Sequence, residues 1–233
     1  MRILAVETSM GPASAALLIR QGASMTVHEA PANPSLEPAE ALLPMIADLM
    51  AGTGTSFTDL ARLAVCVGPG SFTGIRTGLA AVRGLRLALG LPVVSATGFA
   101  IMAQRIVRER APTGRFAIAS SAGREGLYIQ VFAADGAAAD GLRIMSPEDA
   151  ALNLPEDITT IAGPAAGALA DAVSAPGRAS EGLHVWPDIA PLASTLALMA
   201  ATGEADCHPP SALYIKPADA KPQVPPALLK AGG

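Results

Sequence analysis

The chain is poor in cysteine, in aromatic residues and in charge. Of its 233 residues two are cysteine, 3% are aromatic and 15% are charged, whereas an average soluble protein has roughly 25% charged residues. Two cysteines are too few for a disulfide framework. The scarcity of Phe, Tyr and Trp excludes an array of rings that stack nucleic-acid bases, and an apolar content of 51% excludes intrinsic disorder.

Common metal and membrane signals are also missing from the sequence. The three histidines are scattered, and no Cys-x-x-Cys or His-Glu-x-x-His spacing occurs. No apolar run reaches the roughly 18 residues of a membrane-spanning helix, and the first residues lack the apolar region and cleavage site of a secretory signal. We therefore expect a cytoplasmic protein without a metal site or a membrane segment.

The apolar patterns predict α/β architecture in two lobes. The predicted strands cover residues 3–8, 13–20, 25–29, 63–67, 92–95, 115–120, 127–133 and 158–162. The predicted helices cover residues 38–50, 75–89, 100–110, 147–152, 165–173 and 189–201. Because a strand meander followed by alternating helices and strands occurs twice, we expect an N-terminal lobe at 1–111 and a C-terminal lobe at 112–233 that ends in a proline-rich tail.

Charge is unevenly distributed along the chain. Residues 60–124 contain nine arginines and one acid, Glu109, whereas residues 125–206 contain two arginines and twelve acids. Such an arginine block favours contacts with a polyanion. Alternatively, the acidic block folds back over it and neutralises it. The sequence leaves both readings open.

A glycine-rich segment at residues 68–78 is the strongest local motif, because it follows an apolar strand and opens a helix, where backbone N–H groups can bind an anion. It lacks the Gly-Lys-Ser/Thr of a P-loop, and Thr73 stands where a dinucleotide-binding motif has its third glycine. Ser71 is not in the Gly-x-Ser-x-Gly context of a hydrolase nucleophile. A purely structural reading also fits, with Ser71 or Thr73 capping the helix.

The helices at 38–50 and 75–89 carry more apolar or small surface than one core requires. The first shows two apolar faces, and the second adds a line of small residues at spacings of three or four. Surplus of this kind is typical of a protein interface. We expect this interface to be formed by Leu42, Leu43, Ile46, Met50, Thr77, Ala81, Gly84, Leu85 and Ala88.

Four segments resemble the TsaB (YeaZ) family, the dimerisation subunits of the bacterial complex that installs threonylcarbamoyladenosine in tRNA. They are ILAVETS at residues 3–9, EALLPMI at 40–46, VGPGSFTGIRTGL at 67–79 and YIKPADAKP at 214–222. Three positions depart from the family pattern: Glu7 and Ser121 replace a common Asp, and Pro38 replaces a common His. Family members also carry a label as M22 peptidase homologues, although this sequence shows no peptidase site.

The resemblance implies the two-lobed actin-like ATPase (ribonuclease H-like) fold with a degenerate nucleotide cleft. It also implies a non-catalytic scaffold that supports the transferase TsaD, with TsaE completing the machinery and tRNA bound only indirectly. Because an exposed apolar patch seldom stays uncovered, we expect a homodimer through the same interface when the partner is absent. No cofactor is expected to bind tightly, and a weakly bound nucleotide would contact Glu7, Thr8, Ser9, Gly70 and Ser71. The alternative is an actin-like-fold small-molecule kinase or ATPase with Glu7, Thr8, Ser9 and the loop at residues 68–74 at its phosphates.

Overall fold

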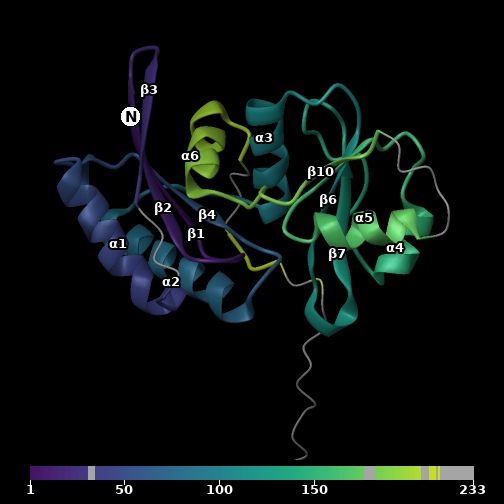
Figure 1. The fold of residues 1–233 in the computed structure, drawn as a ribbon. Coiled ribbons are helices and arrows are strands. Elements are labelled where there is room, and N and C mark those ends of the chain that lie inside the picture. Colours follow the sequence, from purple (N-terminus) through teal and green to yellow (C-terminus); the bar gives the residue numbers. More distant parts are fainter. Residues whose placement is uncertain (31–34, 176–181, 206–209, 214, 216–233) are drawn as a thin grey trace, which may run out of the picture.

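A computed structural model describes residues 1–30, 35–175, 182–205, 210–213 and 215 (Figure 1). Cys207, His208 and most of the segment at 214–222 lie outside the described residues. Among the helices that are described, none combines the length and apolar composition needed to cross a membrane.

The first lobe is built on a five-stranded sheet in the order β3-β2-β1-β4-β5. The strands β1, β2 and β3 form the predicted antiparallel meander, and β4 and β5 continue the sheet in parallel with β1. The bounds are β1 Arg2–Glu7, β2 Ser14–Gln21, β3 Ser24–Glu29, β4 Arg62–Cys66 and β5 Val93–Ala96.

Helices cover both faces of this sheet. Successive side chains of β1 point to opposite faces of the sheet. Leu4 and Val6 therefore lie on the face that is covered by α1 (Pro38–Gly52) and α2 (Phe72–Leu89). Ile3 and Ala5 point to the opposite face, where they pack against α6 (Ala193–Thr202). The buried Cys66 lies on that second face, as expected for a small apolar residue in a strand.

The second lobe repeats the arrangement of the first. Its sheet has the order β10-β9-β6-β7-β8, in which β6, β7 and β8 form the meander while β9 and β10 run parallel to β6. Two helices, α4 and α5, cover its outer face. The bounds are β6 Phe116–Ser121, β7 Leu127–Phe132, β8 Arg143–Met145, α4 Pro147–Asn153, β9 Thr160–Ala162, α5 Ala166–Ser174 and β10 His184–Trp186.

The helices α3 (Gly98–Arg110) and α6 lie between the two sheets (Figure 1). Ile101 of α3 packs with the core of the first sheet, whereas Phe99, Met102 and Ile106 pack with that of the second. The predicted α/β architecture with two lobes is thereby confirmed. The boundary between residues 111 and 112 stays a prediction, but α6, which that boundary assigns to the second lobe, packs on the first sheet.

Short elements differ most from the sequence-based expectation. The strands β8 and β10 were not predicted, and two single-turn 3₁₀ helices stand at Phe57–Asp59 and Gly123–Glu125. The last helix begins at Ala193 rather than at residue 189. Pro191 explains why residues 189 and 190 lie outside the helix, because proline disfavours helical backbone at the residue before it.

Candidate functional site

The end of β1 and the glycine-rich loop form one tightly packed unit. The backbone N–H of Ser71 donates to the carbonyl of Ser9 at 2.8 Å, and the Thr8 hydroxyl donates to the carbonyl of Gly74 at 2.7 Å. A Cβ on Gly70 would lie 2.1 Å from the Ser9 carbonyl oxygen, and one on Gly74 would lie 1.9 Å from that of Thr8. These glycines are therefore explained by contacts within the protein.

Glu7, the last residue of β1, is buried, with 1% of its surface exposed. Its Oε1 accepts hydrogen bonds from the backbone N–H of Ser9 at 2.6 Å, from the Ser9 hydroxyl and from the backbone N–H of Met10 at 3.2 Å. Its Oε2 is buried without a hydrogen-bond partner among the described residues. Burial raises the pKa of Glu7 to about 7, although the hydrogen bonds from Ser9 and Met10 act in the opposite direction.

Cys66 lies beside this carboxyl group, with its Sγ 3.2 Å from the Ser9 hydroxyl. Burial and the negative charge of Glu7 both raise the pKa of the Cys66 thiol. A buried thiol with a raised pKa is a poor nucleophile. Cys66 is thus a structural residue.

The structure brings together the five residues that were expected to contact a nucleotide, but they differ in their exposure to solvent. Glu7, Thr8 and Ser9 are buried, whereas Gly70 and Ser71 are exposed. The Ser71 hydroxyl accepts from the backbone N–H of Gly74 and caps α2, so Ser71, and not Thr73, is the cap.

The helix α1 has one wide apolar face rather than two. Leu42, Ile46 and Met50 are buried in the core, with at most 3% of their surface exposed. This corrects the prediction that these three residues contact a partner. The buried positions 42, 45, 46, 49 and 50 follow helical spacing and form a single stripe against the sheet. Leu43 lies outside the stripe and is 59% exposed.

The residues of α2 that were expected at the interface remain accessible, and their contact with a partner stays a prediction. Ile75, Leu79 and Val82 are buried, and the small-residue line lies toward solvent, with Thr77, Ala81 and Leu85 half-buried and Gly84 and Ala88 exposed. A Cβ on Gly78 would lie 2.5 Å from the Thr8 Oγ1, whereas a Cβ on Gly84 would meet nothing within 4 Å. Within the described part of the chain, Gly84 therefore leaves open a surface that another backbone could approach.

Two exposed apolar residues on this face were missed from the sequence. Leu87 is 89% exposed and Phe72 is 53% exposed, with the Arg76 guanidinium 3.6 Å from the centre of the Phe72 ring. Leu87 follows Thr77 and Gly84 at helical spacing, so extending that line would have found it. We use the name outer face for the exposed and half-buried surface of α1 and α2 made by Leu43, Phe72, Thr77, Ala81, Gly84, Leu85, Leu87 and Ala88.

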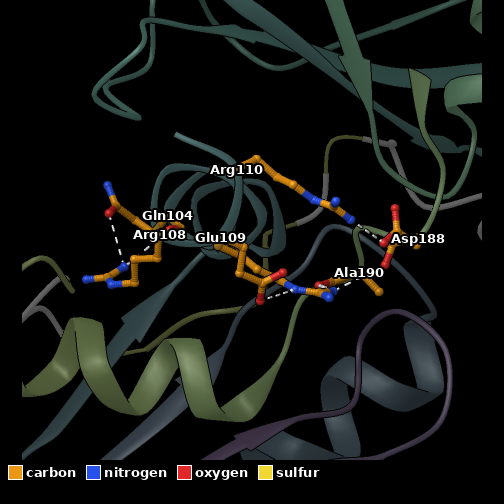
Figure 2. Close-up of polar contacts among 7 residues, drawn as sticks. Gln104, Arg108, Glu109, Arg110, Asp188 and Ala190 are labelled. Atoms are coloured by element: carbon orange, nitrogen blue, oxygen red, sulfur yellow. Dashed lines mark hydrogen bonds and ion pairs between the residues drawn. The ribbon is translucent and has the colours of Figure 1, made fainter. Parts of the chain in front are cut away.

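Arginines of α3 bind other parts of the same chain (Figure 2). Arg110 pairs with Asp188 at 2.7 Å, and Arg108 pairs with Glu204 at 2.7 Å. Arg105 donates to the carbonyls of Asp188 and Ala190 while pairing with Glu109. Both Asp188 and Glu204 belong to the acidic block.

Other arginines of the block are also engaged internally. Arg115 pairs with Asp157, Arg62 donates to the carbonyl of Ala200, and Arg83 donates to the carbonyl of Pro210. Only Arg108, Arg110 and Arg115 are paired with acids of residues 125–206 among the described contacts, and these pairs favour the reading in which the acidic block neutralises this part of the arginine block.

A groove of about 680 Å³ lies between β3 and α1, and neither Glu7 nor the glycine-rich loop lines it. Its walls combine apolar side chains such as Met45 and Leu49 with the carboxylates of Glu29 and Asp48. In the described residues, no group of three or more His, Cys, Asp or Glu side chains is placed to hold a metal ion.

Comparisons with known proteins agree with these observations. The family model "TsaD: tRNA N6-adenosine threonylcarbamoyltransferase" matches residues 30–170. The protein TsaB of Escherichia coli is 36% identical over 113 residues, which are 48% of this chain and 47% of that protein. TsaB of Haemophilus influenzae is 35% identical over 44% of this chain and 42% of its own length. The matches thus span about half the length of these curated relatives.

Longer matches exist as well. An uncharacterized protein of Mycobacterium tuberculosis is 31% identical over 223 residues, 94% of each chain. The structure of YeaZ from Pseudomonas aeruginosa superposes with a TM-score of 0.72 at 26% identity, covering 92% of this chain and 99% of that one. Together with the glycine-rich loop and the repeated sheet order, these matches place the chain in the family that the model describes, and within it the protein belongs to the TsaB (YeaZ) group.

Proposed function

We propose that this protein acts in the biosynthesis of threonylcarbamoyladenosine in tRNA, as a non-catalytic subunit in the cytoplasm that binds and supports a TsaD transferase. Its relatives named TsaB carry that biosynthetic role in their names. TsaE would complete the machinery, tRNA would be held by the partner, and the protein alone would form a homodimer.

The outer face is the observation that carries this proposal. It presents three large exposed apolar side chains, Leu43, Phe72 and Leu87. The α2 part of this face also carries small residues that let a second helix approach closely, and glycine at position 84 costs about 1 kcal/mol in a helix interior relative to alanine. Since nothing within the described chain approaches Gly84, a partner helix packed there would account for the glycine.

In this role the partner, and not this protein, carries out the transfer reaction. The carboxyl group of Glu7, the most perturbed acid at the end of β1, is buried and bonded to its own turn. Ser121 occupies the position where a second acid would be expected at the end of β6. No observation specifically favours the kinase or ATPase alternative.

Substitution of Gly84 by Glu tests the proposal. The added side chain meets open space in the protein alone, so folding should be retained while a charge is placed in the proposed interface. We expect Gly84→Glu to lose co-purification with TsaD. The matched control is Gly167→Glu, because Gly167 is an exposed helical glycine on α5 with equally open surroundings.

The control variant should bind TsaD like the wild type. The far-UV circular dichroism of both variants should match the wild-type spectrum. Retention of TsaD by Gly84→Glu at the wild-type level would contradict the proposed interface.

A further inference from the structure

The strand β3 is an open edge of the first sheet. It stands at one end of the strand order, and among the described residues no strand pairs with its outer side. The backbone N–H of Ala30 donates to the carbonyl of Ala15, its opposite residue across the β2–β3 ladder. Because antiparallel pairing alternates along a strand, the even-numbered residues of β3 face β2. The backbone groups of Met25, Val27 and Glu29 therefore point outward.

The open edge of β3 has few of the features that protect free strands. Proteins protect such edges by short length, by proline or lysine and by bulges. The strand has six residues in unbroken register with β2, and its sequence SMTVHE contains neither proline nor lysine. The outer strands β5, β8 and β10 have only three or four residues. Of the outer strands in the described sheets, β3 is thus the longest and the best suited to pair with a further segment.

The groove between β3 and α1 adjoins this open edge. His28 and Glu29 of β3 line it on one side, and Pro44, Met45 and Asp48 of α1 line it on the other. Successive side chains of a strand point to opposite faces of the sheet. Every second side chain of a segment paired with β3 would therefore enter the groove, and its volume of about 680 Å³ can hold several such side chains.

The charge around the groove selects the kind of segment. Glu29 and Asp48 line the groove, and neither forms an ion pair within the described part of the chain. Residues 21–61 contain five acids and no lysine or arginine. A second copy of this chain paired through β3 would bring like charges together, which is unfavourable. A lysine can instead lay its aliphatic stem on the apolar wall and place its ammonium group at a carboxylate.

We propose that β3 and the groove bind an extended segment of a partner protein in which a lysine or arginine stands between aliphatic side chains. The segment adds to the sheet as a further strand, paired with the outward backbone groups of Met25, Val27 and Glu29. Its cationic side chain lies in the groove beside Asp48. The outer face includes none of these residues, so the inference is independent of the proposed binding to TsaD.

A short peptide tests the strand pairing on the full-length wild-type protein. The probe is acetyl-Thr-Leu-Thr-Lys-Thr-Leu-Thr-amide, whose Leu and Lys side chains share one face when the peptide is extended. We expect saturating peptide to slow amide hydrogen exchange at Met25, Val27 and Glu29 by about tenfold or more, because these groups gain partners. Exchange at Thr26 and His28 should change little, since their amides already face β2.

Reversal of one charge tests the role of the groove. Asp48 is exposed on α1, so Asp48→Lys should fold like the wild type and should weaken peptide binding by about tenfold or more. The matched control is Asp171→Lys, which reverses an exposed acid on α5 of the second lobe and should bind the peptide like the wild type. A peptide with Glu in place of Lys should bind the wild type as weakly as the original peptide binds Asp48→Lys.

Spermidine distinguishes a peptide site from a site for small amines. At a concentration equal to that of the peptide, it should leave the peptide bound, because it cannot pair with the backbone of β3. Four results would each overturn the inference: no binding of the lysine peptide, equal binding by Asp48→Lys and the wild type, exchange slowed without the alternation along residues 25–29, or displacement of the peptide by spermidine.

Discussion

Gly74 of α2 lies so close to Thr8 that a Cβ on residue 74 would be 1.9 Å from the Thr8 carbonyl oxygen. The contact joins the end of β1 to the first turn of α2, and the Thr8 hydroxyl closes it with a hydrogen bond to the Gly74 carbonyl. Glycine at this position therefore sets the distance between helix and sheet.

Substitution of Gly74 by Ala should destabilise the protein by about 1–3 kcal/mol, because the backbone oxygen of Thr8 cannot move away without disturbing β1. The control is Gly84→Ala, also in α2, where the added Cβ meets open space. It should stabilise the protein by about 0.5–1 kcal/mol through helix propensity. Urea unfolding of both variants measures the difference, and equal stabilities would contradict the assigned close contact.

Replacement of Glu7 by Gln should change how stability depends on pH. The pKa of Glu7 is about 7 in the folded protein, above the 4.5 of the free side chain. The folded state therefore binds the proton more tightly, and its stability falls as the pH rises from about 4.5 to about 7. At full ionisation the cost is about 3 kcal/mol.

Because Gln cannot ionise, the stability of Glu7→Gln relative to the wild type should grow across this pH window and stay constant above it. Chemical unfolding at several pH values gives the comparison. A constant difference between the two proteins from pH 4 to pH 8 would show that Glu7 has no raised pKa.

Truncation of Arg105 should loosen the connection between β10 and α6. Its guanidinium donates to the carbonyls of Asp188 and Ala190 and is largely shielded, with 15% of its side chain exposed. We expect Arg105→Ala to cost about 1–2 kcal/mol, since two carbonyls lose their donor.

The control for this substitution is Arg124→Ala, which removes an exposed arginine of the same block and should change stability by less than about 0.5 kcal/mol. Hydrogen exchange should rise at residues 188–190 in Arg105→Ala alone. Unchanged exchange there would mean that these hydrogen bonds do not hold the connection.

The local features of the fold could be predicted from the sequence, because they depend on neighbouring residues. Ser71 and Gly90 mark the two ends of α2 as a helix cap and a left-handed C-cap. The three-residue strands β8 and β10 were missed because their side chains are partly or fully exposed and show no alternation. They form only by pairing with β7 and β9, which no local pattern encodes.

Long-range packing explains the remaining differences. Leu42, Ile46 and Met50 were assigned to an interface because two apolar faces were counted on α1, although their spacing forms one face that the sheet buries. Arg105 and Arg110 both bind Asp188, which lies about eighty positions away along the chain. Composition alone therefore could not show what the arginine block contacts.

The molar mass in solution, measured by size-exclusion chromatography with light scattering, tests the central claim most directly. We predict that the protein alone elutes as a homodimer, that TsaD converts it into a complex containing both chains, and that Gly84→Glu is monomeric under both conditions. A wild-type protein that stays monomeric with and without TsaD would contradict the assignment of the outer face as an interface.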